Sequence, residues 1–509
     1  MKQSNHELLI LAIDLGVTNL KIGVYDKQGN CKGSARLATS CEQPETGITI
    51  HHSEDYLSGI IRGLKQLSGN YPVDLYGVEA VCISGMMGAA IGVDGDWNDI
   101  TTLSTNLDTR YSPQVREMQK LNASGMARFS GTTFPAWGAK LLWWKKEFPE
   151  LYRRVEKFMF LGGYIIGRLA GHTPAEALTD NTYLEQTGLA DTLAGEWSGE
   201  LVSGFSLDMK KLPRICRPTD IAGHLSSEMA GKTGLRSGIP IVAGGGDKPV
   251  GALGAGITRP GMILNESASF GAFTVCTDRF DTDTFCGMSE LVPSPLPGLY
   301  YPTFGLMGSG LSLAWMATLF SGDRKDANRL LETLEVKAAM LPPGSEGLMA
   351  IGLLEGRPYP VYPEIRGLWI GHTLHHRQEH FYRAMLESYA YEYRFFYDKV
   401  KSVVKSPDAS VTVIGGGAGC SLWNQIKSDV LGLEYRCLNR DDATLLGNVL
   451  IAGSAIGIYD DLKTAGRAFI RTERSFRPDP DLYKTYGKLY DTYIELIESN
   501  RKIFQDLSS

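Results

Sequence analysis

The chain has 509 residues, of which 43% are hydrophobic and 21% charged, and its formal net charge is −6. This length exceeds what one hydrophobic core usually serves, so we expect two or more domains. The acidic balance argues against a nucleic-acid partner, and no apolar run reaches the ~18 residues that a membrane-spanning helix needs. We therefore expect a soluble globular protein without a nucleic-acid or membrane partner.

The cellular compartment is indicated by the N-terminal sequence and by the cysteines. The first residues, "MKQSNHELLI", run directly into a strand pattern and lack the apolar region and cleavage site of a signal peptide. The eight cysteines are scattered and form no CxxC pair, which is a poor disulfide framework and a poor zinc site. A reducing cytoplasm fits these features best.

Short β-rich runs alternate with amphipathic helices along the whole chain, which is the pattern of an α/β protein. The pattern predicts strands at 8–13, 20–26, 78–84, 239–243, 262–266, 271–276 and 410–414. It predicts helices at 55–67, 138–147, 380–401 and 421–431.

The organisation into domains is suggested by a glycine-rich segment near the midpoint of the chain, at 244–261. We place the boundary there, with an N-terminal domain at 1–254 and a C-terminal domain at 255–509. Residues 8–30 and 262–280 each read as strand, polar turn, strand. One such unit in each half predicts two similar domains that face each other across a cleft.

The first loop that could carry chemistry follows the strand at 8–13. Asp14 ends this strand, and Gly16, Thr18, Asn19 and Lys21 follow it. A carboxylate there could hold a hydrated magnesium ion, while backbone N–H groups and the Thr18 hydroxyl meet phosphate oxygens and Lys21 adds a positive charge. The alternative is a tight β-hairpin with a solvated aspartate and asparagine.

The second loop is "IPIVAGGGDKPVGALGAG", an apolar strand that runs into three glycines and then Asp247. The glycines let a substrate approach the backbone, and Asp247 lies at the carboxyl end of a strand, where α/β proteins bind ligands. A carboxylate so placed suits a general base that takes a proton from a hydroxyl nucleophile. The alternative is a helix N-cap aspartate after a flexible loop.

The third loop, "VTVIGGGAGCSLWNQIKSDVLG", is again strand, glycine run and helix. The glycines at 415–417 would lie flat against a purine or ribose, with Ser421 or Asn424 donating from the helix start. Taken singly this signal is weak, because glycine turns end many buried strands.

The three loops together are more specific than any one of them. Their order along the chain resembles that of the FGGY carbohydrate kinases of the actin/hexokinase-like superfamily, and the resemblance covers almost the whole chain. The segment "DATLLGNVLIAGSAIGIYDD" is similar to the family's late helix, and residues 367–387 look like its C-terminal signature, although His372 departs from it. The matching signature residues are Gly367, Trp369, Gly371, His380, Phe381, Ala384, Met385, Leu386 and Glu387.

The resemblance implies two RNase-H-like domains that flank a catalytic cleft and close over Mg-ATP and a ketose or polyol. It implies that Asp247 deprotonates the sugar hydroxyl and that Asp14 and Asp247 face a magnesium ion, with Thr18, Asn19 and Lys21 near the phosphates. The nucleotide would contact Gly310, Gly416, Gly417, Ala418 and Ser421. The most similar branch is that of the xylulokinases, so phosphorylation of D-xylulose to D-xylulose 5-phosphate is the leading expectation.

The sequence departs from the family at two places that matter. The second phosphate loop usually reads Gly-Thr-Ser or Gly-Thr-Thr, whereas this chain has Ser267, Ala268 and Ser269. The loss of the threonine hydroxyl removes one phosphate donor, a cost of about 1–3 kcal/mol if neither Ser267 nor Ser269 replaces it. The Met-His-Gly segment that contacts sugar in xylulokinases is Met86-Met87-Gly88 here, and methionine does not bind a hydroxyl as histidine does.

Other substrate-side positions also differ. The family's Trp-Asn-Asp is Asn106-Leu107-Asp108 here, and Lys248 follows Asp247 where a neutral polar residue is common. Asp108 and Arg110 are candidate sugar ligands, although solvated loop charges would be equally ordinary. For two aromatic residues, Trp137 and Phe134, packing in the core is favoured over lining a sugar pocket.

Three alternatives stay open. The pattern of His376, Glu379 and His380 matches an H-x-x-E-H zinc motif, but no third ligand can be identified. Ala268 and Met87 would also fit a nucleotide-binding regulator without turnover. Within the enzyme class, autoinducer-2, ribulose, gluconate and glycerol are alternative substrates, autoinducer-2 because its kinases share the Asn-x-Asp-x-Arg arrangement. Family members are often dimers, which leaves a homodimer open.

Overall fold

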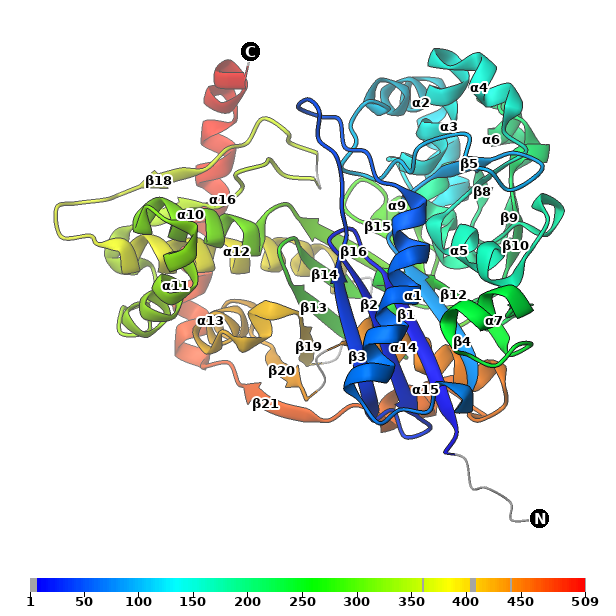
Figure 1. The fold of residues 1–509 in the computed structure, drawn as a ribbon. Helices are drawn as coiled ribbons and strands as arrows, with labels where there is room; N and C mark the ends of the chain where they lie inside the picture. The colour runs from blue at the N-terminus through cyan, green and yellow to red at the C-terminus, as the bar shows by residue number, and fades with distance from the viewer. Residues whose placement is uncertain (1–6, 359–360, 403–408, 440–441, 509) are drawn as a thin grey trace.

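The computed structural model describes residues 7–358, 361–402, 409–439 and 442–508 (Figure 1). Two mixed sheets lie at its centre. The first has the strand order β11-β12-β4-β1-β2-β3, in which β1 pairs with β4 in parallel and with β2 in antiparallel fashion. Its strands are β1 Leu9–Leu15, β2 Asn19–Asp26, β3 Cys31–Ala38, β4 Val78–Gly85, β11 Ile221–His224 and β12 Pro240–Gly246.

The second sheet has the order β15-β16-β14-β13-β19-β20-β21. Its central strand, β13, pairs with β14 in antiparallel fashion and with β19 in parallel, which repeats the arrangement around β1. The strands are β13 Ile263–Ser267, β14 Gly271–Val275, β15 Glu290–Pro293, β16 Tyr300–Leu306, β19 Ser410–Ile414, β20 Glu434–Leu438 and β21 Thr472–Phe476. The weak internal resemblance between residues 8–30 and 262–280 is thus a real structural repeat.

The central strand of the first sheet is buried on both faces, because successive side chains point in opposite directions. Leu11 and Ile13 belong to one hydrophobic cluster, which includes Ile60 of helix α1 (Ser53–Asn70). Ile10 and Ala12 belong to another, which includes residues of helix α14 (Ala443–Ala455). This double coverage explains why the strand reads as a continuous apolar run.

All seven strands and all four helices that the sequence predicts are present, with shifts of a few residues at their ends. The helices of the N-terminal half gather around the first sheet and in a separate lobe at the upper right of Figure 1. They are α2 Ser112–Gly125, α3 Ala136–Glu147, α4 Pro149–Arg154, α5 Leu161–Ala170, α6 Gly199–Gly204, α7 Ser227–Thr233 and α8 Asp247–Gly254. Short strands in this half are β5 Ile91–Val93, β6 Lys157–Met159, β7 Leu178–Asp180, β8 Ala190–Asp191, β9 Glu196–Trp197 and β10 Arg214–Cys216.

The C-terminal half carries a second set of helices, most of which lie beside its own sheet (Figure 1). They are α9 Thr282–Phe285, α10 Ser309–Ser321, α11 Arg324–Ala338, α12 Gln378–Val400, α13 Ser421–Leu431, α15 Leu462–Ala468 and α16 Pro480–Ser508. A small hairpin is formed by β17 Met349–Ile351 and β18 Leu368–Ile370. No helix in the described part of the chain is both long and apolar enough to cross a membrane.

Helix α14 joins the two halves, since it comes from the C-terminal half and packs on α8, β1 and β4 of the first sheet. The two helices touch through glycines. A Cβ atom on Gly254 would lie 1.8 Å from the Ala443 carbonyl oxygen, and one on Gly447 would lie 2.1 Å from that of Val250. The small residues of this late helix therefore permit close packing. The boundary at 254/255 stays a prediction, because a helix from beyond it completes the N-terminal core.

The two aromatic residues expected in the core have different environments. Trp137 is fully buried and stacks on Phe160, with ring centroids 4.8 Å apart. Phe134 is 47% exposed, so its assignment to the core was wrong. It lies in the loop before α3, and loops run over the protein surface.

Candidate active site

The carboxyl ends of three neighbouring strands form the edge on which the predicted acidic residues lie. β1, β4 and β12 run parallel, and Ser84 of β4 is the register partner of both Asp14 and Gly245. Asp247 begins helix α8 two residues after Gly245. The structure therefore brings Asp14 and Asp247 to one edge, and the Asp247 charge contributes to the raised pKa of Asp14.

Asp14 is 4% exposed and is held by two neighbours. Ser84 Oγ donates a hydrogen bond to Asp14 Oδ1 at 3.1 Å, and Lys21 Nζ lies 3.4 Å from Asp14 Oδ2. Burial raises the pKa of Asp14 to about 7, although Lys21 opposes that shift. Lys21 also pairs with Asp442 at 3.0 Å, and Asn448 of α14 donates to Ser84 Oγ at 2.8 Å. Asp442 and Asn448, from the C-terminal part of the chain, thus hold Lys21 and Ser84, the two side chains that contact Asp14.

Asp247 is the first residue of α8, where the positive end of the helix dipole favours a carboxylate. The backbone N–H of Lys248 donates to Asp247 Oδ1 at 2.9 Å. Burial raises the pKa of Asp247 to about 6, the Lys248 charge opposes the shift, and Glu266 adds to it. A carboxylate with this pKa is mostly ionised at neutral pH yet basic enough to accept a proton, as a general base must be.

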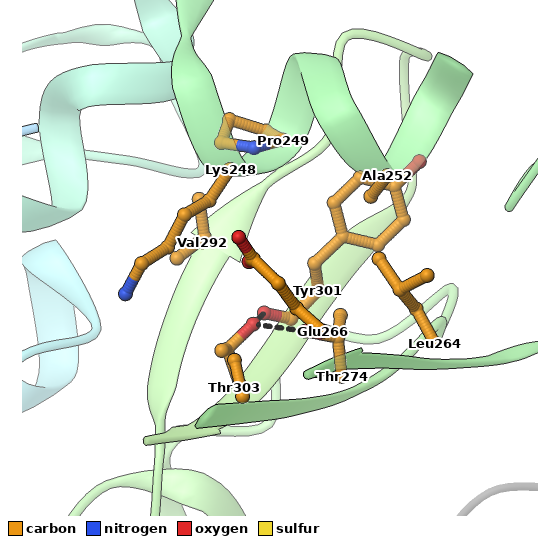
Figure 2. A pocket seen from close by; sticks show the side chains of 10 residues that line it. Lys248, Pro249, Ala252, Leu264, Glu266, Thr274, Val292, Tyr301 and Thr303 are labelled. Carbon is orange, nitrogen blue, oxygen red and sulfur yellow. Dashed lines mark hydrogen bonds between the residues drawn. The ribbon is translucent and has the colours of Figure 1, made fainter. Parts of the chain in front are cut away.

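Two acidic residues near Asp247 were not found from the sequence. Glu290 of β15 lies 3.6 Å from Lys248 Nζ. Glu266 of β13 points from the second sheet into a small cavity beside the start of α8, and Lys248 also lines this cavity (Figure 2). Burial raises the pKa of Glu266, while Lys248 and Lys21 oppose the shift. A charged residue within the apolar strand pattern 262–266 was the signal available for Glu266.

Residues 86–88, which were predicted to contact the sugar, follow β4 and lie next to the glycine run that precedes Asp247. A Cβ atom on Gly246 would lie 3.0 Å from Met87 Cγ, so Met87 packs beside the residue that precedes Asp247. Gly88 has φ +78° and faces Asn106, whose Oδ1 would be 2.5 Å from a Cβ atom there. Met86 and Met87 are buried. The segment 86–88 is therefore part of the wall next to the candidate base.

A buried lysine supports this wall. Lys140 Nζ donates to the Gly88 carbonyl oxygen at 2.8 Å and to Asn106 Oδ1 at 3.0 Å. It also lies 4.0 Å from the centre of the Tyr111 ring. Burial holds the pKa of Lys140 well below its ordinary value. Lys140 was not singled out from the sequence, since α3 also contains Lys145 and Lys146, and nothing in the sequence marks Lys140 as the buried one.

Asp108 is not exposed to solvent, and both oxygens of its carboxylate already have hydrogen-bond partners within the protein. It is fully buried, and Arg110 pairs with both of its oxygens at 2.8 Å. Ser104 Oγ also donates to Asp108 Oδ2 at 3.2 Å. The guanidinium of Arg110 lies 4.8 Å from the centre of the Trp143 ring. A sugar would have to compete with this ion pair, so the role of Asp108 in binding stays a prediction.

The first phosphate loop is the tight turn that joins β1 to β2, and its outer side is exposed at Thr18. The Gly16 N–H donates to the Asn19 carbonyl oxygen at 3.1 Å, and Asn19 Nδ2 donates to Thr18 Oγ1 at 3.0 Å. A Cβ atom on Gly16 would lie 2.6 Å from the Asn19 carbonyl oxygen, so the turn needs glycine. Thr18 is exposed at the same sheet edge as Asp14.

The second phosphate loop and the two predicted nucleotide segments meet in the C-terminal half. A Cβ atom on Gly310 would lie 2.5 Å from the Ala268 carbonyl oxygen, and one on Gly417 would lie 2.6 Å from Ser267 Cβ. Gly416 faces open space. The structure thus gathers the end of β13, the start of α10 and the glycine run after β19 into one place.

Three serine hydroxyl groups in this region differ in whether they could bind a phosphate or are already buried or hydrogen-bonded. Ser267 is buried, and its Oγ donates to Asn265 Oδ1 at 3.0 Å while it accepts from Lys427 Nζ at 2.9 Å. Ser269 is exposed. Ser421 Oγ accepts from Arg474 Nη1 at 3.3 Å, and Arg474 Nη2 donates to the Ala418 carbonyl oxygen at 3.0 Å. Of the two serines expected to replace the missing threonine, only Ser269 presents a free surface.

The zinc alternative fails. His380 Nδ1 accepts from the Arg377 N–H at 3.1 Å, and His376 Nδ1 accepts from the Thr373 N–H at 2.8 Å. Within the described ranges, no group of three or more His, Cys, Asp and Glu side chains is arranged to hold a metal ion. The H-x-x-E-H pattern overlaps the start of α12: His380 accepts a hydrogen bond from the residue that precedes the helix, and His376 lies in the turn before it.

Comparison with known proteins agrees with this geometry. Residues 9–254 match the N-terminal domain, and residues 283–456 the C-terminal domain, of the FGGY family of carbohydrate kinases. The chain belongs to this family. It is thus a sugar kinase with the two-domain α/β fold of the family, as the sequence predicted.

Individual relatives align along nearly the full length. A xylulose kinase of Lactococcus lactis subsp. lactis (strain IL1403) is 26% identical over 98% of both chains. An autoinducer-2 kinase of Enterobacter sp. (strain 638) is 25% identical over 95% of this chain and 92% of its own. The crystal structure of a ligand-bound xylulose kinase from Lactobacillus acidophilus superposes with a TM-score of 0.88, at 22% identity over 98% of this chain and 100% of the other.

Proposed function

We propose that this kinase transfers the γ-phosphoryl group of ATP to a hydroxyl group of a ketose or polyol, with D-xylulose as the first candidate and D-xylulose 5-phosphate as its product. The observation that supports this proposal most is the placement of Asp14 and Asp247 at one sheet edge, close enough for their charges to interact. Phosphoryl transfer depends mainly on positioning and charge neutralisation, and this edge supplies both.

In this proposal Asp247 is the general base. It takes the proton of the attacking hydroxyl as that oxygen bonds to the γ-phosphorus, and the bond from phosphorus to the bridging oxygen of ADP breaks. Its pKa of about 6 leaves it ionised at neutral pH. Met87, which packs beside Gly246, and the adjacent Gly88 would place the sugar against it.

The residues of the first edge also fit a magnesium ion. Mg²⁺ is usually held by one or two carboxylates, water and substrate phosphates, and the buried Asp14 and the partly buried Asp247 are two carboxylates at one edge. When bound, the ion would neutralise charge on the β- and γ-phosphates. Lys21 would add a second positive charge, and Thr18 and Asn19 would donate from the exposed turn.

On the nucleotide side we assign the phosphate-facing hydroxyl to Ser269, since that of Ser267 is engaged within the protein. Gly310, Gly416 and Gly417 would let the nucleotide approach the backbone, with Ala418 and Ser421 at the edge of the same surface. Ala268 adds no hydroxyl, so this loop has fewer side-chain donors than the family pattern.

The substrate is open between two classes that the relatives represent, because both a xylulose kinase and an autoinducer-2 kinase align over most of the chain at nearly the same identity. An ATP-consumption screen with purified protein over ketoses, polyols, aldonates and autoinducer-2 decides this. We expect the highest kcat/KM with D-xylulose. A higher value with another compound would replace the substrate and keep the kinase, whereas nucleotide binding without turnover on every compound would favour a regulator.

A further inference from the structure

Lys427 of helix α13 is a buried cation that the mechanism above does not use. Its side chain has no exposed surface and reaches under the second phosphate loop. Nζ donates to Asn265 Oδ1 and to Ser267 Oγ, both at 2.9 Å, and lies 4.3 Å from the centre of the Trp423 ring. All of these partners are neutral.

A buried ammonium group without a carboxylate is costly, because burial removes its hydration and nothing of opposite charge replaces it. The titratable groups that face Lys427 are the thiols of Cys420 and Cys437, and the Tyr435 ring lies 5.4 Å away. Glu266 belongs to the same strand as Asn265 and Ser267, but alternation along the strand turns it to the opposite face, toward α8. The balancing anion is therefore not among these neighbours.

The place of Lys427 indicates which anion would balance it. Ser267, its partner, is in contact with the glycine run, since a Cβ atom on Gly415 would lie 2.7 Å from the Ser267 carbonyl oxygen. The next residue, Ala268, accepts the N–H of Gly310 at 3.2 Å. Lys427 thus lies directly behind the junction of the three segments that form the proposed nucleotide site.

We propose that Lys427 is a positioning residue for the nucleotide: it fixes the second phosphate loop through Ser267, and its charge balances a bound phosphate group. This inference rests on the proposed nucleotide site. It explains how a loop that lacks the family's threonine hydroxyl at Ala268 can still hold a phosphate, because the charge comes from behind the loop instead of from its tip.

The charge state of Lys427 makes this proposal testable. Burial lowers the pKa of Lys427 to about 7 in the free protein. A phosphate nearby favours the protonated form and raises that pKa, so the complex binds more protons than the free protein at pH values above 7. Nucleotide affinity should then fall as pH rises above 7, by up to about tenfold per pH unit. Below pH 6 the lysine is already protonated in both states and the dependence disappears.

The experiment is calorimetric titration of the full-length protein with MgADP at pH 6 and pH 8, in two buffers of different ionisation enthalpy. At pH 8 the nucleotide phosphates are already ionised, since a phosphate monoester has its second pKa at about 6. We expect the wild type to take up more protons than K427R at pH 8, up to about 0.9 proton if the lysine is fully protonated in the complex, and almost no excess at pH 6. Arginine keeps the positive charge but does not titrate in this range.

Two further variants make the test specific. K427M removes the charge and should weaken MgADP binding by tenfold or more at pH 6, with no excess proton uptake at pH 8. K140M removes a second buried lysine, behind Gly88 in the N-terminal half, and should leave the proton uptake of nucleotide binding unchanged. Asp14 and Asp247 are unchanged in all of these variants. Proton uptake that is lost in K427R but kept in K140M therefore comes from Lys427 and not from these two carboxylates.

The outcomes are distinct. Equal proton uptake in the wild type and K427R at pH 8 would overturn the proposal even if both bind MgADP, because Lys427 would then be only a structural residue. If K427M does not fold, the comparison of wild type with K427R still decides. A folded wild type that binds neither MgADP nor MgATP would overturn the nucleotide site itself, and the proposed function with it.

Discussion

The two sheets place the same supersecondary unit on the two sides of the site, but with different chemistry. β1 and β13 each pair with an antiparallel neighbour on one side and a parallel strand on the other. In the first unit Asp14, one residue before the end of β1, is paired with Lys21. The second ends in Ser267, which is held from behind by Lys427. The repeated fold thus supplies a scaffold, and the side chains at the strand ends decide which ligand each half can hold.

The same comparison extends to the penultimate residues of the two strands, which are both acidic. Asp14 lies one residue before the end of β1, and Glu266 one residue before the end of β13. Their charges act on the same cleft, since Asp14 contributes to the raised pKa of Glu266. Only Asp14 has a serine and a lysine in contact. We infer that the first half carries the acidic machinery and that Glu266 tunes it from the second half.

The largest effect is expected from D247N, which removes the base but keeps the shape. We expect kcat to fall by about 10²–10⁴-fold, the range for loss of a general base, while MgATP affinity stays nearly unchanged. Steady-state kinetics and calorimetric titration with MgATP measure the two quantities. The control is D96N in an exposed turn, which should behave as the wild type. Substantial residual activity in D247N would refute its role as base.

D14A should have the next largest effect, and it tests whether the first edge is the metal edge. Loss of this carboxylate should reduce kcat by about 10²-fold or more and raise the Mg²⁺ concentration needed for half-maximal rate, since the ion contributes several kcal/mol of charge stabilisation. The matched variant S84A keeps the carboxylate but removes the hydrogen bond that Ser84 Oγ donates to Asp14 and the one that it accepts from Asn448, each at a cost of about 1 kcal/mol. An unchanged magnesium titration in D14A would count against the assignment.

G254A tests the connection between the two halves. A Cβ atom at this position would lie 1.8 Å from the Ala443 carbonyl oxygen, so α8 and α14 must separate. We expect the free energy of unfolding to fall by about 1–3 kcal/mol, as for other overpacked cores. The control is G231A in α7, where nothing lies within 4 Å of the added Cβ and alanine should stabilise by about 0.5–1 kcal/mol. Denaturant unfolding of both variants measures the difference, and a G254A protein as stable as G231A would contradict the packing argument.

The sequence predicted the fold well where the physical signal was local. The buried strand at 8–13 and the glycine turns gave strong patterns, because a strand covered on both faces must be apolar at every position. The proximity of Asp14 to Asp247, by contrast, was expected only from the family resemblance. The inward orientation of Ser267, the ion pair of Asp108 and the positions of Lys140 and Lys427 depend on contacts between distant segments. A lysine in an amphipathic helix looks the same in sequence whether it faces water or a phosphate loop.

The smallest expected effect concerns the opposite charges around Asp247, and it measures how far the second sheet acts on the first. Glu266 raises the pKa of Asp247 and Lys248 lowers it. Because Asp247 must be ionised to act as base, kcat/KM falls as pH decreases through about 6. E266Q should move this acidic limb to lower pH, and K248M should move it to higher pH, each by a fraction of a pH unit.

The two shifts have opposite signs, so a general loss of activity cannot imitate them. A pH–rate profile of kcat/KM between pH 5 and 8 for the wild type and both variants gives the comparison, with E228Q on the surface of α7 as the control that should not shift. If E266Q and K248M move the limb in the same direction, or not at all, the charges of Glu266 and Lys248 do not act on the base. The two halves would then act on the substrate and the nucleotide separately, each from its own sheet edge.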